Sequence, residues 1–343
     1  EIGGGFGGKI ASYLEGPAAM LSRITARPVT MSMTRAEEFT STGPSSGTNI
    51  KVRMGATREG RITAATAEMH YEAGAYPGGM IDMGASAMFS CYEIPNARID
   101  GYDVVVNKPK SDTYRAPGAT PAVFACEQTI AELAERLGMD PLEFRAINLS
   151  RKGSPKLDGS INPYTGSVQV LEAVKNHPHL TSDLGTPLDG HSRGRGIAFG
   201  FWGNWGAESS GIINVHTDGT VTLIMGSVDL TGTRTSMAMI AADTLGIPLD
   251  QVSAVMGDTG TVAYSEVSAG SRTTVATGRA VYEASLDAID KMRHRAALLW
   301  ELADESVEYT KGFFSTTDDP AQTISFSELA GMLPDTGGPL SGV

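Results

Sequence analysis

The order of apolar and polar residues along the chain predicts short strands joined by tight turns. Six segments alternate in the manner of strands, and they are residues 28–33, 50–56, 61–71, 99–107, 212–216 and 220–225. Turn sequences ending in glycine, at residues 58–60 and 217–219, separate neighbouring segments. This arrangement predicts two β-hairpins.

Apolar residues recur every three or four positions after residue 120, which predicts an amphipathic helix. They are Val123, Cys126, Ile130, Leu133 and Leu137. Gly138 supplies the carboxy-terminal stop, because glycine readily adopts the left-handed conformation that ends helices. Asp140 is then expected to cap a second helix that has Pro141 at its first position.

Three more helices are expected. One lies within residues 12–22, which are rich in small apolar residues, and one follows residue 235, with Ile240 and Leu245 on its apolar side. A long third helix follows residue 274, and its apolar stripe is Leu286, Ile289, Met292, Ala296 and Leu299.

The chain of 343 residues is long enough for two domains, because single cores rarely grow beyond about 250–300 residues. Residues 151–193 are rich in Gly, Pro, Ser and Asp and are expected to form a linker. We therefore predict one domain over residues 1–150 and another over residues 194–343.

Composition excludes several kinds of partner. The formal net charge of −12 would repel a nucleic-acid backbone, and no apolar run is long enough to cross a membrane. The two cysteines, Cys91 and Cys126, are too few for an iron–sulfur cluster, so we expect both to serve in packing. The scattered histidines complete no metal site.

The first ten residues contain five glycines around Phe6, a density that favours a loop whose main-chain amides touch an anionic ligand. Tight turns without a ligand are the alternative interpretation. Residues 3–9 also fit the spacing of a phosphate loop, but Ile10 stands where that loop needs a hydroxyl for Mg²⁺. A nucleotide triphosphatase is therefore disfavoured.

Three later segments are candidates for ligand contacts. Residues 114–118 present Arg115 on a loop stiffened by proline, suited to a carboxylate or phosphate, although a surface ion pair is the simpler alternative. Residues 226–235 and 265–274 are turns rich in hydroxyls, and each precedes a predicted helix. An aromatic cluster of Phe201, Trp202 and Trp205 lines a pocket or lies in the core.

Two of these segments carry a family resemblance. The run GGGFGGK at residues 3–9 resembles the glycine loop of the molybdenum-binding subunit of the xanthine dehydrogenase, aldehyde oxidase and carbon monoxide dehydrogenase family. The block from Tyr114 through Asn148, with its arginine loop, Glu-Leu-Ala at 132–134 and Leu-Gly-x-Asp-Pro-x-Glu-x-Arg at 137–145, resembles the same family. The later turns fit it as well, so the resemblance covers essentially the whole chain.

The resemblance implies an α+β fold with two molybdopterin-binding domains of small mixed sheets and packed helices. It implies a molybdenum hydroxylase that oxidises an aldehyde or an N-heterocycle with water as the oxygen source. The expected cofactor is molybdopterin with molybdenum, in its cytosine dinucleotide form. A [2Fe-2S] subunit and an FAD subunit are the expected partners, and the cytoplasm is the expected compartment, with the periplasm as the alternative.

Carried over position by position, the resemblance assigns cofactor contacts to four turns. The residues are Phe6, Gly7, Arg115, Thr231, Gly232, Ala269, Gly270 and Ser271. We expect these turns to meet around one crevice. Ile10, Ala116 and Pro117 depart from the patterns of the purine-oxidising and carbon monoxide enzymes, so neither of those substrates is supported.

The chain begins at Glu1 without methionine, and the family's carboxy-terminal glutamate base lies outside it, so we expect a fragment that is inactive alone. No catalytic residue or metal ligand is assigned within these residues. The alternative function is a cofactor-free homologue that serves as a scaffold or interaction module.

Overall fold

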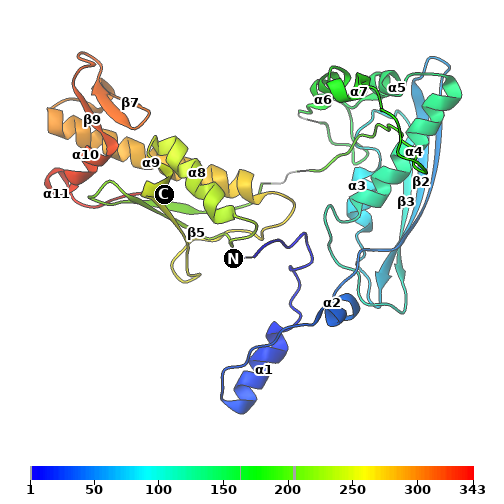
Figure 1. Cartoon of the computed structure of the whole chain (residues 1–343), viewed down its shortest axis with the longest axis horizontal. Helices are drawn as coiled ribbons and strands as arrows, with labels where there is room; N and C mark the ends of the chain where they lie inside the picture. Colours follow the sequence, from blue (N-terminus) through cyan, green and yellow to red (C-terminus); the bar gives the residue numbers. More distant parts are fainter. Residues whose placement is uncertain (1, 163, 204–205) are drawn as a thin grey trace. The chain divides into compact units, whose positions relative to one another are not determined.

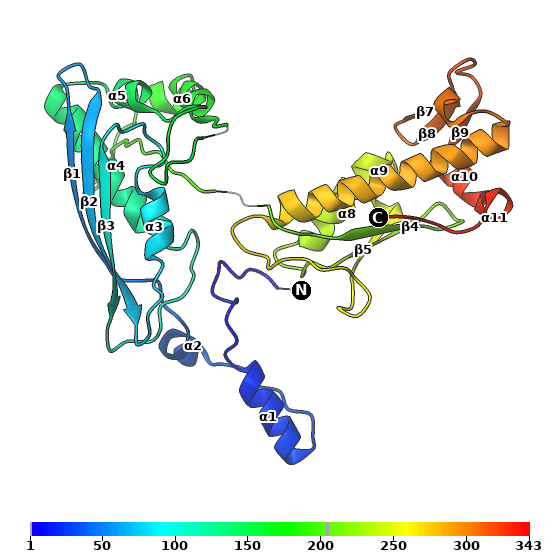
Figure 2. The same ribbon diagram turned by 180° about the vertical axis from the view of Figure 1, so that it is seen from behind.

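The computed structural model describes residues 2–162, 164–203 and 206–343 of the chain. It divides into two compact units (Figures 1 and 2). The N-terminal unit comprises residues 6–202, and the C-terminal unit comprises residues 203–343 together with residues 1–5. Both units combine small sheets with packed helices, which confirms the predicted α+β class.

The N-terminal unit contains a three-stranded sheet in the order β1-β2-β3. Strands β1 (Thr48–Ala56) and β2 (Ile62–Gly74) form the first predicted hairpin, and β3 (Ala97–Val105) runs parallel to β2. Alternate residues of β2 are buried because one face of the sheet is covered by helices α3 (Ile81–Met88) and α4 (Ala119–Leu137), as Figure 1 shows.

Helix α4 ends as its sequence predicts. Cys126 and Ile130 of the predicted stripe are buried against the sheet, and Gly138 adopts a left-handed φ of 65° at the carboxy-terminal end. Helix α5 (Pro141–Asn148) follows, and the Asp140 carboxylate accepts hydrogen bonds of 2.9 Å from the amides of Leu142 and Glu143. The predicted cap is confirmed.

Residues 137–148, which carry part of the family resemblance, hold elements of the N-terminal unit together. Arg145 is fully buried and donates two hydrogen bonds, of 2.7 and 3.1 Å, to the Glu127 carboxylate, which also accepts from the Tyr92 hydroxyl. Asn148 accepts from the amide of Ile62 at 2.8 Å. These polar groups therefore fix α4, α5 and the sheet to one another.

Residues 151–193, expected to be a linker, carry helices α6 (Ser167–Lys175) and α7 (Pro178–Thr181). Leu171 is 2% exposed and packs in a small core with Leu142 and Leu149. The segment is therefore folded onto the N-terminal unit rather than being a bare connection.

The alternation at residues 28–33 does not form a strand, so that prediction is wrong. The segment connects α1 (Glu15–Thr25) to α2 (Arg35–Ser41), and neither helix has a buried residue. Alternation sets only the direction of side chains, and a strand also needs a partner strand to accept its main-chain hydrogen bonds.

The C-terminal unit is built on a four-stranded sheet in the order β10-β4-β5-β6. Strands β4 (Gly211–Val215) and β5 (Val221–Met225) form the second predicted hairpin, and β5 is parallel to β6 (Val252–Met256). The further elements are α8 (Thr233–Leu245), η1 (Leu249–Gln251), α9 (Thr273–Trp300), η2 (Asp304–Ser306), β7 (Val307–Thr310), β8 (Phe313–Thr316), β9 (Thr323–Ser325), α10 (Phe326–Gly331), α11 (Leu333–Thr336) and β10 (Leu340–Gly342).

Helices α8 and α9 pack against each other and against the sheet. The predicted stripe of α9 is only partly correct, because Leu286 and Leu299 are 38% and 40% exposed. Ile289, Met292 and Ala296 of that stripe are buried as predicted. Ala284 and Ala288 complete the buried face in place of the two leucines, because small residues let α8 and the sheet approach closely. In the described parts of the chain, no helix has the length and apolar character of a membrane span.

Candidate functional site

The glycine loop and the arginine loop contact each other within the N-terminal unit. The Arg115 amide donates to the carbonyl oxygen of Phe6 at 2.7 Å, and the Thr113 hydroxyl donates to that of Gly7 at 2.8 Å. The Arg115 guanidinium carbon lies 6.0 Å from the centre of the Phe6 ring. The structure therefore brings Phe6, Gly7 and Arg115 together.

Gly7 is required at its position. Its φ is +92°, and an added Cβ would lie 2.9 Å from the carbonyl oxygen of Thr113. Because no side chain fits, the two loops approach backbone to backbone. Phe6 is 58% exposed and Arg115 is also exposed, so both side chains remain accessible to a ligand.

The far end of the arginine loop is anchored to the core of the N-terminal unit. Gly118 has a φ of +72°, and an added Cβ would overlap the carbonyl oxygen of Met80. The hydroxyl of fully buried Tyr71 donates to the Gly118 carbonyl at 2.8 Å, and burial raises the pKa of that hydroxyl. The loop is thus held rigidly in front of α4.

In the C-terminal unit, the start of the chain pairs with the turn before α8. The Ile2 amide donates to the Asp229 carbonyl at 3.0 Å, and the Thr231 amide donates to the Ile2 carbonyl at 2.8 Å. The Asp229 carboxylate is 3.3 Å from the Arg234 guanidinium. Thr231 and Gly232 therefore occupy a turn held on both sides, directly at the amino-terminal end of α8.

The predicted residues Ala269, Gly270 and Ser271 form the corresponding turn before α9. The Arg272 amide donates to the Ala269 carbonyl at 3.2 Å, and Gly270 and Ser271 have φ values of 59° and 62°. The turn leads into α9, which begins at Thr273. Two similar turns thus stand at the starts of the two packed helices.

Arg272 is the residue that the sequence interpretation missed. Its side chain is fully buried, and it donates to the hydroxyl of Ser209 at 2.6 Å. It also donates to main-chain carbonyls, and these belong to Gly206, Ala207, Glu208, Glu266 and Val267. The guanidinium holds the turn before α9 against residues 206–209. The sequence signal that could have identified Arg272 is its position next to the small residues that precede a predicted helix.

A chain of hydroxyl groups joins the two turns of the C-terminal unit. The Ser227 hydroxyl, at the end of β5, is 2.7 Å from that of Thr277 in the first turns of α9. Thr277 donates to Ser209 at 3.3 Å, and Ser209 in turn accepts from Arg272. Both turns are therefore fixed to one buried polar network.

Backbone strain is concentrated in the predicted contact turns. Nine non-glycine residues in the described parts of the chain have positive φ, and five of them lie in these turns. The five are Phe6, Arg115, Ala116, Thr231 and Ser271. Left-handed conformations of this kind cost about 1–3 kcal/mol each and gather at ligand-binding sites.

The predicted aromatic cluster is only partly described. Phe201 is 38% exposed and lines a pocket of the N-terminal unit. Trp202 is half-buried. Trp205 lies outside the described residues.

Comparison with known proteins identifies what these turns belong to. Two family models, each described as a molybdopterin cofactor-binding domain, match residues 1–149 and 182–342. The chain is 32% identical over 273 residues to an aldehyde oxidoreductase molybdenum-binding subunit of Escherichia coli O157:H7, covering 75% of this chain and 36% of the relative. It is 27% identical to a subunit of a probable xanthine dehydrogenase of Bacillus subtilis, covering 96% of this chain and 45% of that relative.

Solved structures agree. A Cu,Mo carbon monoxide dehydrogenase shares 25% identity with a TM-score of 0.79, over 100% of this chain and 48% of that one. The aldehyde oxidoreductase of Desulfovibrio desulfuricans shares 26% identity with a TM-score of 0.77, over 99% of this chain and 36% of that one. The chain thus spans less than half the length of these relatives.

Fold, turns and matches define a protein with two molybdopterin cofactor-binding domains. The chain belongs to the xanthine dehydrogenase and aldehyde oxidoreductase family of molybdenum-binding subunits.

The residues present fit such a cofactor. Gly232 has a φ of +82°, and an added Cβ there would meet no atom within 4 Å, so the main chain is open to a ligand. The turn at 269–271 precedes a helix of 28 residues, whose amino-terminal end favours a phosphate group. The exposed Thr231 and Ser271 add hydroxyls at the same helix starts.

Proposed function

We propose that this chain is the molybdopterin-binding part of a molybdenum hydroxylase that oxidises an aldehyde or an N-heterocycle, with water as the source of oxygen. The names of its relatives support this proposal, since they include an aldehyde oxidoreductase subunit, a xanthine dehydrogenase subunit and a nicotinate dehydrogenase subunit. The activity belongs to the complete enzyme that contains the chain. That the 343 residues alone are inactive stays a prediction.

The observation that carries the proposal is the match between strained backbone and expected contacts. Four residues assigned from the family resemblance, Phe6, Arg115, Thr231 and Ser271, have left-handed φ values although none is glycine. A folded chain retains such strain where surrounding contacts or a ligand hold the turn. We infer that the turns are shaped for the cofactor.

The proposed contact residues have different roles. Phe6 and Gly7 present the glycine loop to the metal end of the cofactor, and Arg115 orients the carbonyl or ring of the substrate through its guanidinium. Thr231, Gly232, Ala269, Gly270 and Ser271 hold the pterin and its nucleotide through main-chain amides and hydroxyls at the helix starts. When bound, the molybdenum centre supplies two-electron oxidation.

The same proposal extends to partners. Relatives are named as subunits of larger enzymes, including a dehydrogenase complex subunit gamma. We propose that one partner subunit carries iron–sulfur clusters and another carries FAD, as the family resemblance implies, and the two cysteines of these residues are too few to ligate a cluster. We further propose the cytosine dinucleotide form of the cofactor and a cytoplasmic location.

The test is cofactor content in the native complex. The variant Gly7→Ala, which places a Cβ 2.9 Å from the Thr113 carbonyl oxygen, should lose most of its molybdenum and pterin, measured by elemental analysis and by fluorescence of the released pterin. Gly3→Ala is the matched control, because an added Cβ there meets nothing within 4 Å. It should retain both.

Absence of molybdenum from the unmodified complex would instead support the cofactor-free scaffold. Equal cofactor content in the Gly7→Ala and Gly3→Ala variants would show that the glycine loop is not a contact.

A further inference from the structure

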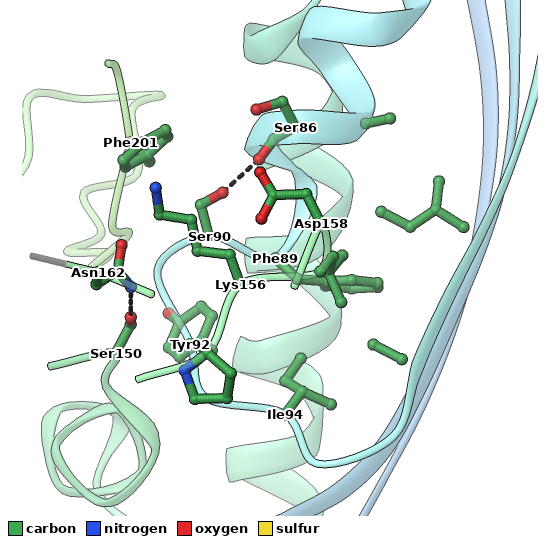
Figure 3. A pocket seen from close by; sticks show the side chains of 15 residues that line it. Ser86, Phe89, Ser90, Tyr92, Ile94, Ser150, Lys156, Asp158, Asn162 and Phe201 are labelled. Atoms are coloured by element: carbon green, nitrogen blue, oxygen red, sulfur yellow. Dashed lines mark hydrogen bonds between the residues drawn. The ribbon is translucent and has the colours of Figure 1, made fainter. Parts of the chain in front are cut away.

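A pocket of about 470 Å³ lies within the N-terminal unit, away from any residue assigned to the cofactor. Its lining comes from the end of α3, the segment that leads into β3, and a hairpin at residues 153–162 (Figure 3). Packing defects in protein interiors rarely exceed the size of a water molecule. A pocket of this volume has the dimensions of a small-molecule site.

One part of the pocket wall is apolar and partly aromatic, and polar side chains line the rest. Phe89 and Tyr92 are 3% and 4% exposed and form the inner wall together with Ile94 and Ile99. Figure 3 shows Phe201 on the opposite side from Phe89. A flat apolar molecule would bury both of its faces between these walls.

Two charged side chains project into the pocket from the hairpin. Lys156 and Asp158 lie in the turn of this hairpin, which is closed by the Gly159 amide on the Lys156 carbonyl at 3.1 Å, and both line the pocket. Among the described residues, the Lys156 ammonium donates no hydrogen bond and lies in no ion pair, and it interacts electrostatically with the Asp158 carboxylate. One Asp158 oxygen accepts from the amide and hydroxyl of Ser160, at 2.9 and 2.6 Å, which leaves the other oxygen for a ligand.

The charge state of Asp158 follows from the same contacts. The hydrogen bond from the Ser160 hydroxyl, with that from the Ser160 amide, lowers the pKa of the Asp158 carboxyl. Asp158 is thus ionised near neutral pH, and its charge balances that of Lys156. The lining offers one donor cation and one acceptor anion with no net charge between them.

The hairpin is held in place at its base. The Ser154 hydroxyl donates to the Glu93 carboxylate at 2.7 Å. The Asn162 amide donates to the Ser150 hydroxyl at 2.5 Å, and Figure 3 draws this second bond. Gly159 permits the tight turn with a φ of +81°. The backbone that carries Lys156 and Asp158 is therefore in place before a ligand arrives, which lowers the entropic cost of binding.

We propose that this pocket binds a neutral, planar aromatic lactam or amide. The ring system lies between Phe89 and Phe201, the carbonyl accepts from Lys156, and the N–H donates to Asp158. An organic anion is disfavoured because Asp158 would repel it, and a cation is disfavoured because Lys156 would do so. The site is independent of the proposed molybdenum chemistry, since it contains none of the cofactor residues.

The test is fluorescence titration of the full chain with phenanthridinone, a neutral tricyclic lactam. We expect saturable binding with a dissociation constant of about 100 µM or tighter. Phenanthridine, which lacks the carbonyl and N–H, and phenanthrene carboxylate, which is an anion, should each bind at least about tenfold more weakly.

Variants locate the site. Lys156→Met and Phe201→Ala should each weaken phenanthridinone binding about tenfold or more, while Lys156→Arg retains it. Lys152→Met is the matched control, because Lys152 is exposed but does not line the pocket. Arg115 belongs to the proposed cofactor site and does not line the pocket, so Arg115→Met should leave phenanthridinone binding unchanged. A loss of binding in this variant would place the ligand at the cofactor site instead.

The absence of saturable binding, equal or tighter binding of the carboxylate, or loss of binding in Arg115→Met but not in Lys156→Met would each overturn the proposal. Circular dichroism of every variant checks that the chain remains folded.

Discussion

The Arg272 side chain donates a hydrogen bond of 2.6 Å to the hydroxyl of Ser209, although 63 residues separate them in the chain. Through this contact, and through the carbonyls that surround it, one buried guanidinium joins the segment before β4 to the turn before α9. Its hydrogen-bond partners among the described residues are carbonyl and hydroxyl oxygens, and the Glu266 carboxylate interacts with it electrostatically without forming an ion pair.

Removing this guanidinium should destabilise the C-terminal unit strongly. In Arg272→Met, the carbonyls lose their donor while still buried, and the free energy of unfolding should fall by roughly 3 kcal/mol or more. Arg272→Lys should retain part of the stability, since an ammonium group replaces some donors. Urea denaturation measures both. Arg279→Met, which breaks an exposed pair with Glu283, should cost less than about 1 kcal/mol.

The buried pair of the N-terminal unit offers a second test. Arg145→Met leaves the Glu127 carboxylate buried without its cation, and we expect a loss of about 3–5 kcal/mol in the free energy of unfolding. Adding Glu127→Leu should recover part of the loss, because the unpaired charge is then gone. The exposed pair of Arg136 with Glu132 is the control, and Arg136→Met should change urea stability little. A double variant no more stable than Arg145→Met would contradict this account.

Stability at alkaline pH should depend on the cysteines. Burial, with a smaller contribution from the Glu127 carboxylate, raises the pKa of the Cys91 thiol from 9.0 to about 12. The unfolded chain therefore releases this proton near pH 9, and the folded chain retains it. The resulting stability is fully present below pH 9 and is lost as the pH rises toward 12, by about 1.4 kcal/mol per pH unit.

Comparison with Cys91→Ala isolates this effect. Urea denaturation between pH 8 and pH 11 should show a steeper decline for the unmodified chain than for the variant. Parallel declines would show that the thiol does not stay protonated in the folded state. Cys91 is not among the groups that shift the pKa of Tyr71 or Tyr92, so these tyrosines cancel from the difference, whereas Cys91 makes a small contribution to the raised pKa of the Cys126 thiol.

Two threonine-to-glycine substitutions at the start of α8 should change the free energy of unfolding in opposite directions, because only one of the threonines has a strained backbone. Thr231 has a φ of 56°, which is costly for a β-branched residue, so Thr231→Gly should raise the free energy of unfolding by about 1 kcal/mol. Thr235→Gly, on an exposed position of α8, should lower it by about 0.5–1 kcal/mol. Thermal denaturation of the two variants gives the comparison. A destabilised Thr231→Gly would mean that the threonine makes contacts that outweigh its strain.

Local signals made several elements predictable. Asp140 and Pro141 specify the start of α5, and Gly138 specifies the end of α4, because capping and left-handed stops depend only on residues a few positions away. The hairpins followed from alternation around glycine-containing turns. The turns that we propose as cofactor contacts are predicted from their small residues, their position before helices and the family resemblance, and their contacts stay a prediction.

The three-dimensional packing decided what those local rules could not. Leu286 and Leu299 were placed on the buried side of α9 from spacing alone, but α8 and the sheet select the side that carries Ala284 and Ala288. Residues 28–33 have a strand pattern but no partner strand within the described parts of the chain.

By itself, the sequence determined the elements, their caps and the turns that carry the family resemblance, because each depends on neighbours along the chain. Only the tertiary structure decided that Arg272 is a buried anchor and that Lys156 and Phe201 line one pocket. The acceptors of Arg272 and the opposite wall of that pocket come from distant segments, and no local pattern records which distant segment folds against which.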